Sequence, residues 1–351
     1  MKNRLYQGLV LLSFTLYIVS CSKKDNPAPV PTPTPIVIAP PPDFGYKVVG
    51  YFPSYRNPAS VPDVKFRMTN VVNYAFFTIN ASGALTLNSP STFTAVVAKA
   101  KANGAKVFMS VNGAASDFQS ATLSATGRNT LIKNIMGNVR QYLLDGVDID
   151  WEFPSTANGT HTQFTALMKE LSDSCHLDKK YYLTAAITPG KYAGSFRDAI
   201  EAPVFGYVDW FNVMVYDDFS TTVPYKHHAD MAFANVSLNY WIGTRGMPST
   251  KFVMGLPGYG RPSGITQTNT ILTYSGILAQ GGSPTSDSAV VTSSGWATPY
   301  TVYYNGTTTA KLKAIKAKQQ AAGMMLWEKG QDANDGNSLL KAICDTVGRG
   351  Y

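Results

Sequence analysis

Histidine is scarce in this chain of 351 residues, with only four copies. The spacing of His161, His176, His227 and His228 does not join them to clustered acids in the way that metal ligands require. We therefore expect no metal centre and no bound cofactor. The adjacent pair His227 and His228 lies in a stretch with Lys and Pro neighbours, and we expect it at the surface.

Cysteine is equally rare, with three copies, which is too few for a disulfide framework. Cys175 and Cys344 lie far apart, each in a segment with a helical pattern. Two thiols in an exported protein could pair, but we predict that both are small buried hydrophobic residues.

Charge is also limited, because Asp, Glu, Lys and Arg make up 15% of the chain and the formal net charge is +8. The basic residues are scattered, and several fall on one predicted helix around residues 311–318. A nucleic-acid site needs a continuous basic stripe, so this distribution argues against nucleic acid as a partner. Charge alone does not identify the ligand.

The apolar run over residues 9–19 is too short to span a membrane as a helix. Basic residues precede it, so residues 1–20 are typical of a secretory signal peptide. Ile18-Val19-Ser20-Cys21 then resembles a bacterial lipobox, which predicts that Cys21 is lipidated and becomes the mature N-terminus. The alternative is an ordinary signal peptide with an incidental cysteine. We expect an exported protein, anchored by lipid at the bacterial cell envelope, at the outer membrane or the cell surface.

Half of residues 27–42 are proline. Such a segment favours polyproline II and cannot build a core. We therefore predict a linker over residues 21–42 that holds one domain, residues 43–351, away from the lipid anchor.

Short apolar runs alternate with amphipathic segments through this domain, the pattern of βα units around a parallel sheet. The predicted strands are 47–51, 71–79, 106–111, 147–153, 182–187, 210–216, 252–255 and 323–327, and the clearest helices are 91–102, 128–144, 161–174, 233–243 and 309–322. Eight such units predict an α/β fold, a single (β/α)8 TIM barrel, with functional residues at the C-terminal ends of the strands.

The fourth predicted strand carries four acids in Asp145-Gly146-Val147-Asp148-Ile149-Asp150-Trp151-Glu152. Strand side chains alternate between faces, so Asp148, Asp150 and Glu152 are expected on one face about 7 Å apart, with Trp151 in the core behind them. Half-desolvated carboxylates this close raise the pKa of at least one of them. The row therefore predicts acid catalysis; the alternatives are an acidic edge strand or a site for a hard cation.

Aromatic residues end several of the other predicted strands. The candidate site residues at strand ends are Tyr51, Tyr74, Phe76, Ser110, Gly113, Met214, Tyr216, Asp217, Tyr259, Gly260, Arg261 and Trp327. Aromatic rings stack on the C–H faces of sugars and carboxylates bind sugar hydroxyls, so this set predicts a carbohydrate-binding cleft around the acids.

The pattern from Asp145 to Glu152 resembles the catalytic signature of glycoside hydrolase family 18, the chitinases and their relatives. Other stretches similar to strand motifs of that family are Val49–Ser54, Asn73–Phe76, Met214–Asp217, Gly255–Arg261 and Trp327. Asn112 and Gly258 depart from the family pattern, and we expect both to reshape the cleft.

Between Arg261 and Thr309 the chain has no helical pattern and is rich in Ser, Thr and Gly. Many members of the family carry a small α+β insertion here. This segment is short by comparison, which implies a short insertion between strand 7 and the last barrel helix, and a more open cleft. Its aromatic residues are either sugar platforms or the core of the insertion.

The resemblance implies a retaining, substrate-assisted hydrolase that cuts within chains of β-1,4-linked N-acetylglucosamine, a chitinase. Glu152 would be the general acid and then the base. Asp150 would orient the acetamido group and stabilise the cationic intermediate, and Asp148 would share a proton with Asp150. Tyr216 would donate a hydrogen bond to the acetamido oxygen, and Trp327 would stack beneath the sugar.

Two other functions stay open. One is an endo-β-N-acetylglucosaminidase that cuts the chitobiose core of N-glycans, and the other is a surface lipoprotein that binds glycans without cutting them. Lectins of the family typically lose the acid, whereas this chain retains Glu152. In each case we expect a monomer whose partner is a carbohydrate: chitin, chito-oligosaccharides or N-glycans.

Overall fold

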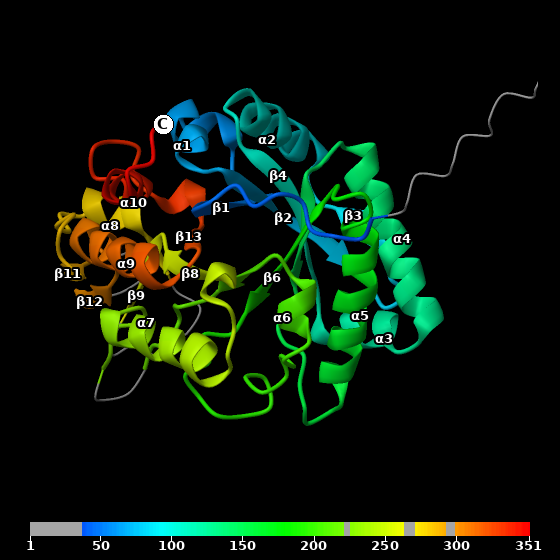
Figure 1. Ribbon diagram of the computed structural model, residues 1–351. Helices are drawn as coiled ribbons and strands as arrows, with labels where there is room; N and C mark the ends of the chain where they lie inside the picture. Colours follow the sequence, from blue (N-terminus) through cyan, green and yellow to red (C-terminus); the bar gives the residue numbers. More distant parts are fainter. Residues whose placement is uncertain (1–36, 221–224, 263–270, 293–298) are drawn as a thin grey trace, which may run out of the picture. The chain divides into compact units, whose positions relative to one another are not determined.

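A computed structural model describes residues 37–220, 225–262, 271–292 and 299–351, which form part of one compact unit (Figure 1). The predicted signal peptide, the predicted lipidation site Cys21 and most of the linker lie outside these residues, so those features stay predictions. No helix within the described ranges is long and apolar enough to cross a membrane.

Eight parallel strands close into a barrel, as the sequence predicts. In order around it they are β1 (Lys47–Pro53), β2 (Val71–Ile79), β4 (Lys106–Asn112), β5 (Gly146–Asp150), β6 (Tyr182–Ile187), β7 (Trp210–Val213), β8 (Phe252–Pro257) and β13 (Gly323–Trp327). The barrel closes because β1 pairs with both β2 and β13. A short strand, β3 (Leu85–Leu87), pairs antiparallel with the end of β2.

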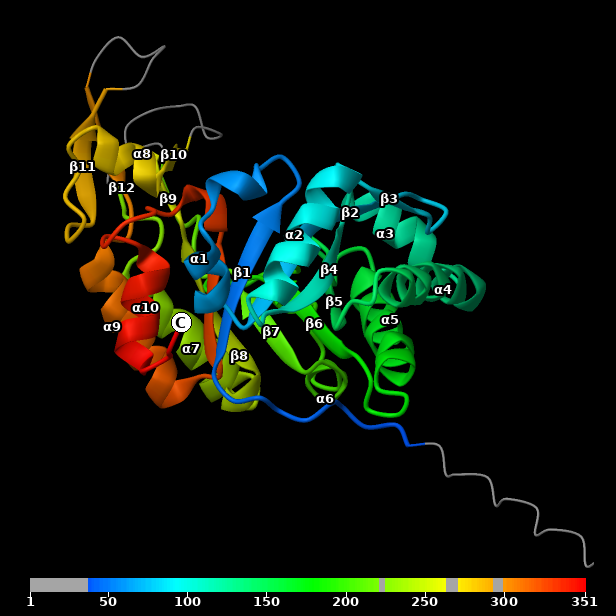
Figure 2. The same cartoon turned by 90° about the horizontal axis from the view of Figure 1, so that it is seen from above.

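Helices surround the barrel (Figures 1 and 2). They are α1 (Asp63–Met68), α2 (Pro90–Ala102), α3 (Ala115–Thr122), α4 (Ala125–Gln141), α5 (Thr160–Cys175), α6 (Val204–Tyr207), α7 (Met231–Leu238), α9 (Thr307–Gln320) and α10 (Leu339–Val347). Short helical turns are η1 (Pro58–Ser60), η2 (Asn239–Thr244), η3 (Ser249–Lys251) and η4 (Lys329–Gln331). The predicted helix 233–243 is therefore divided between α7 and the π-helical η2.

The barrel helices bury one face each against the strands. On α5, for example, Phe164, Leu167, Leu171 and Cys175 recur at helical spacing and are all buried. Cys175 and Cys344 are unpaired and buried, as predicted.

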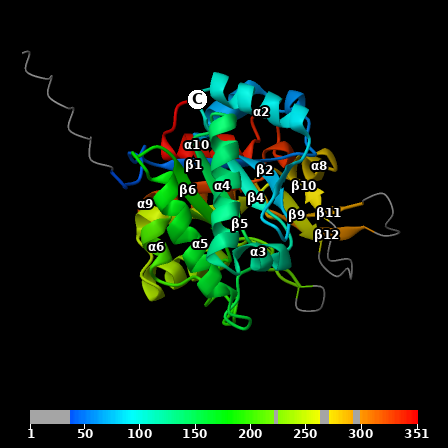
Figure 3. The same ribbon diagram turned by 90° about the vertical axis from the view of Figure 1, so that its right-hand side faces the viewer.

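The insertion between β8 and α9 forms a second, antiparallel sheet with the strand order β10-β9-β12-β11, seen beside the barrel in Figure 3. Its elements are β9 (Tyr259–Pro262), β10 (Leu272–Thr273), α8 (Tyr274–Ala279), β11 (Ser288–Val291) and β12 (Tyr300–Tyr303). Helix α8 corrects the expectation of a segment without helix. Tyr274 and Tyr304 are buried with ring centroids 6.0 Å apart, so these two aromatics form the core of the insertion.

The N-terminal end of the barrel is filled by aromatic rings. Phe44 packs edge-on against Tyr182 and Trp210, with centroids 5.4 and 5.8 Å away. The segment 37–45 leads to this position: Ala39 N–H donates to the His176 carbonyl, and the Tyr182 hydroxyl donates to the Pro42 carbonyl at 2.8 Å. This end is closed, and the opposite end of the barrel carries the pocket described next.

Candidate active site

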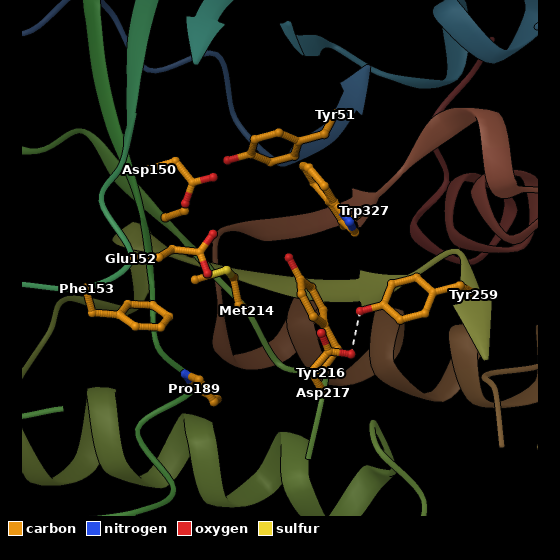
Figure 4. Close-up of a pocket in the computed structure, with 11 residues that line it drawn as sticks. Tyr51, Asp150, Glu152, Phe153, Pro189, Met214, Tyr216, Asp217, Tyr259 and Trp327 are labelled. Carbon is orange, nitrogen blue, oxygen red and sulfur yellow. Dashed lines mark hydrogen bonds between the residues drawn. The ribbon is translucent and has the colours of Figure 1, made fainter. Parts of the chain in front are cut away.

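A pocket of about 320 Å³ lies at the C-terminal ends of the barrel strands (Figure 4). Its lining comes from six barrel strands or the residues that follow them: Tyr51, Asp150, Glu152, Phe153, Ala186, Pro189, Met214, Tyr216, Asp217, Tyr259 and Trp327. The volume suits a small-molecule or sugar site. Eight of the residues predicted from sequence therefore meet in one cavity.

Asp148 lies beneath the pocket and is fully buried inside the barrel. Its Oδ2 accepts hydrogen bonds from the Tyr51 hydroxyl at 2.7 Å and the Ser110 hydroxyl at 2.8 Å. Its Oδ1 accepts from Thr184 Oγ1 at 2.6 Å and Asn212 Nδ2 at 3.0 Å. Burial raises the pKa of Asp148, and these four donors act in the opposite direction by favouring the anion.

Asp150 is the next acid on the same face of β5 and is 4% exposed. Its Oδ1 has no hydrogen-bond partner among the described residues. Burial holds the pKa of Asp150 well above its usual range, and the negative charges of Glu152 and Asp148 raise it further. Asn112, one of the departures from the family pattern, supports the strand here by donating to the Asp150 carbonyl at 2.8 Å.

Glu152 lies beyond the end of β5 and is the most exposed of the three acids. The predicted strand 147–153 is therefore too long. Strand β5 ends at Asp150, so the three carboxylates do not all lie on one regular strand. Burial of part of its carboxyl group raises the pKa of Glu152; hydrogen bonding with Asp150 lowers it, and the charge of Asp217 raises it. In Figure 4 the Glu152 and Asp150 side chains lie next to each other at the pocket wall.

Tyr216 faces these acids from the other side of the pocket (Figure 4). It is 9% exposed, and its pKa is raised well above the usual value by burial and by the negative charges of Asp150 and Glu152. The hydroxyl therefore stays protonated and available as a hydrogen-bond donor.

Asp217 follows Tyr216 and adopts a left-handed backbone conformation, with φ of 68°. Its carboxylate accepts from the Tyr259 hydroxyl at 2.6 Å and from Arg261 Nε and Nη2 at 2.9 and 2.8 Å. Burial alone would raise the pKa of Asp217, but its neighbours His228, Arg261 and Tyr259 hold it well below the usual range. Asp217 therefore stays ionised and places a negative charge in the wall of the pocket.

Trp327 ends β13 and lines the pocket together with Tyr51, whose ring centroid is 5.3 Å away. Phe76 stacks on Trp327 with centroids 5.7 Å apart. Phe76 is not among the residues that line the pocket, and its contact with substrate stays a prediction.

Four other predicted positions are not among the residues that line the pocket. Gly260 lies in β9, where it pairs with Leu272 of β10. Arg261 binds Asp217, as described above. Gly113 is packed so closely against β2 that a Cβ atom would lie 2.7 Å from the Ile79 side chain. Tyr74 is buried and its hydroxyl donates to the Asn88 carbonyl, which corrects its placement at the cleft.

The histidine pair also differs from the expectation. His228 is fully buried and packs against Asp217 and Tyr259. His227 is half-buried and packs against the end of β12, where its Nε2 lies 2.6 Å from the Tyr304 carbonyl. Among the described residues, no three His, Cys, Asp or Glu side chains are grouped to hold a metal ion.

Phe153, Ala186 and Pro189 line the pocket but were not predicted from the sequence. Phe153 directly follows Glu152, and Ala186 and Pro189 lie at or just after the end of β6, the fifth barrel strand. The barrel rule applied to every strand would have found them.

Comparison with known proteins gives a consistent result. The model of the family "Glycosyl hydrolases family 18" matches residues 47–332. The chain is 28% identical to a probable chitinase 10 of Drosophila melanogaster over 70% of its own length, but spans only 12% of that protein. It is 26% identical to a class V chitinase of Arabidopsis thaliana, covering 81% of this chain and 87% of the relative. In structure it is similar to a GH18 chitinase from the chitin utilization locus of Flavobacterium johnsoniae, with a TM-score of 0.69, 25% identity, and coverage of 86% of this chain and 94% of that one.

Proposed function

The chain belongs to glycosyl hydrolase family 18, and from that membership we propose that it is a chitinase. Its substrates would be polymers or oligomers of β-1,4-linked N-acetylglucosamine, cut within the chain with retention of configuration. The names of the relatives described above support this substrate class.

One observation carries the proposal: an exposed acid with a raised pKa, Glu152, lies beside a buried carboxylate oxygen without a partner, Asp150 Oδ1. An unsatisfied buried acceptor costs free energy, which a donor from the ligand removes. The N–H of a 2-acetamido group is such a donor. Tyr216 would donate to the carbonyl oxygen of the same group, so the two residues would hold the acetamido group from both ends.

In the proposed reaction Glu152 donates its proton to the glycosidic oxygen as the bond to the anomeric carbon breaks. The acetamido oxygen attacks that carbon and forms a bicyclic oxazolinium cation, in the substrate-assisted manner of the family. Water then attacks the same carbon while Glu152 takes its proton. Two displacements on one centre give retention.

Asp148 and Asp150 would hold one proton between them during these steps. Burial raises both pKa values, and four donors favour the anion at Asp148. Movement of the proton toward Asp148 would leave Asp150 anionic next to the cation as it forms. Trp327 would support the face of the sugar bound over these acids.

The test uses protein that lacks residues 1–21, which keeps the contacts of the segment 37–45. Wild type and Glu152→Gln are incubated separately with chitohexaose and with a high-mannose N-glycoprotein, and the products are resolved by mass. Short chito-oligomers from the wild type, with at least about a hundredfold less from Glu152→Gln, support the proposal. Release of the glycan, leaving one N-acetylglucosamine on Asn, would instead establish the N-glycan activity. Binding of either substrate without cleavage would establish a glycan-binding protein.

We also propose that the enzyme is exported and anchored through a lipid on Cys21. The support is the sequence of residues 1–21 alone. Metabolic labelling with a fatty acid should mark the wild type but not Cys21→Ala, and equal labelling of the two would refute the anchor.

A further inference from the structure

His228 is a buried side chain that contacts Asp217 without lining the pocket. The left-handed conformation of Asp217 costs free energy in a residue with a side chain, although aspartate tolerates it better than most, and contacts with neighbours stabilise it. The contacts of His228 identify it as one of those neighbours.

Two successive backbone N–H groups of this turn donate hydrogen bonds to His228. The N–H of Asp217 donates to His228 Nδ1 at 3.3 Å, and the N–H of Asp218 donates to the His228 carbonyl at 3.0 Å. With Nδ1 as the acceptor of this hydrogen bond, we assign the ring proton of a neutral imidazole to Nε2, which is buried and has no hydrogen-bond partner among the described residues. Asp217 Oδ1 lies 3.5 Å from the same Nδ1, so protonation there would exchange the amide contact for a contact with the carboxylate.

The position of His228 is fixed from two other elements. Its ring lies parallel to that of His227 at 5.7 Å and packs on Tyr259 at 5.4 Å. His227 Nδ1 accepts from Ala229 N–H, and its Nε2 lies 2.6 Å from the Tyr304 carbonyl at the end of β12.

Behind this loop, Lys313 of α9 donates to the Ala229 carbonyl at 2.7 Å and to Asn305 Oδ1 at 2.8 Å. The insertion and α9 therefore both hold the segment that carries His228. A residue held this firmly can restrain the turn at Asp217.

We propose that His228 is a positioning residue: as a neutral hydrogen-bond acceptor for the Asp217 amide, it fixes the turn that holds the Asp217 carboxylate in the wall facing Glu152. This inference deepens the proposed function and rests on it for its kinetic consequence. The charge of Asp217 acts on Glu152, so a displaced turn changes the acid as well as the wall.

The groups around His228 keep it neutral. Asp217 favours its protonation, whereas burial, Arg261 and Lys313 oppose it, and the remaining neighbours Tyr259 and His227 are uncharged. The net direction is a lowered pKa for His228.

The decisive comparison is His228→Asn against His228→Leu. The two replacements have nearly the same shape, but only Asn places an acceptor where Nδ1 was. We expect kcat/KM for chitohexaose to fall by about tenfold or more in His228→Leu and to stay within about threefold of wild type in His228→Asn. The alkaline limb of the pH profile should move to lower pH in the Leu variant alone, since the charge of Asp217 no longer faces Glu152.

His176 provides a matched control, because it is a buried histidine 3.2 Å from an aspartate, Asp209, at the closed end of the barrel. His176→Leu should lower the unfolding temperature and leave kcat/KM and the pH profile unchanged. If the Leu and Asn variants of His228 had the same kinetics, the proposal would be overturned. A residue that serves only stability does not need a hydrogen-bond acceptor at this position.

Two spectroscopic measurements decide the role of His228 without activity. Nitrogen chemical shifts should show a protonated Nε2 and an unprotonated Nδ1, and exchange of the Asp217 amide with deuterium should be faster in His228→Leu than in wild type or His228→Asn. A protonated Nδ1, or equal exchange in the three proteins, would overturn the proposal. A wild type that cuts no substrate would refute the proposed function, and these measurements would still decide the role of His228.

Discussion

The ring of Phe76 lies against that of Trp327, with their planes inclined by only 21°. Phe76 is a predicted substrate contact, and in the structure it stacks on the pocket residue Trp327. An aromatic pair of this kind contributes about 0.5–1.5 kcal/mol beyond the area that it buries. Phe76 therefore restrains the surface on which we propose that a sugar stacks.

Replacing Phe76 by Ala should raise KM for chito-oligosaccharides by about two- to tenfold, the range that such an energy allows, with a smaller effect on kcat. Steady-state kinetics on chitohexaose measures both. Tyr74→Phe is the control, because Tyr74 is buried two residues earlier on β2 and donates only to carbonyls outside the pocket. An unchanged KM in Phe76→Ala would show that Trp327 keeps its position without this ring.

Asp217→Asn should shift the alkaline limb of the kcat/KM profile to lower pH. The negative charge of Asp217 raises the pKa of Glu152, so its removal lets the proposed acid lose its proton at a lower pH. Arg261→Gln removes a positive charge from the same place and should move the limb upward or not at all. Shifts in the same direction for both variants would mean that the pair acts through structure rather than charge.

Asp150→Asn should increase the free energy of unfolding at neutral pH while abolishing the proposed activity. The pKa of Asp150 in the folded state lies well above its unfolded value of about 3.9, so this group lowers stability as pH rises through that interval. The Asn variant should have nearly the same free energy of unfolding as wild type near pH 3.5 and a higher one at pH 7. Denaturant unfolding at the two pH values measures the difference.

Asp148→Asn is the matched replacement on the same strand and should destabilise the protein. All four groups around Asp148 donate to it, so an amide nitrogen there would face donors. If both variants changed stability with the same sign, the contrast between the two acids would be wrong.

Lys313→Met should change how stability depends on pH. Burial lowers the pKa of Lys313 to about 7, against about 10.4 in an unfolded chain. Between these values the unfolded state binds a proton that the folded state has lost, so this group makes stability rise with pH by about 1.4 kcal/mol per unit. The Met variant should lack that component between pH 8 and 10. Parallel curves for the two proteins would show that Lys313 stays charged when buried.

The barrel was predictable from sequence because each βα unit is encoded locally. Strand alternation correctly placed Asp148 and Asp150 on the inner face of β5. Trp151, just beyond the strand, is also in the core as predicted, and its ring stacks on Phe118 at 5.0 Å. The position of Glu152 was less predictable, because alternation holds only within a strand and β5 ends two residues earlier.

The burial of His227 and His228 could not be read from their neighbours in sequence. Their contacts come from Tyr259 and from Tyr304 at the end of β12, more than seventy residues downstream of His227 in the latter case. The same reason explains why the contact of Phe76 with Trp327 was not predicted, because Trp327 belongs to the last strand of the barrel. Local patterns identify strands and acids, whereas the contacts that orient them join distant parts of the chain.

The segment 37–45 has a mechanical consequence for the enzyme. Tension on the chain ahead of residue 37 is met first by the bridge between Ile38 and Leu177 and then by the hydrogen bond from Tyr182 to Pro42, both at the closed end of the barrel. These contacts bear the load before it reaches β1. If the protein is anchored as we propose, a pull on the chain ahead of residue 37 would be resisted at the end of the barrel away from the carboxylates.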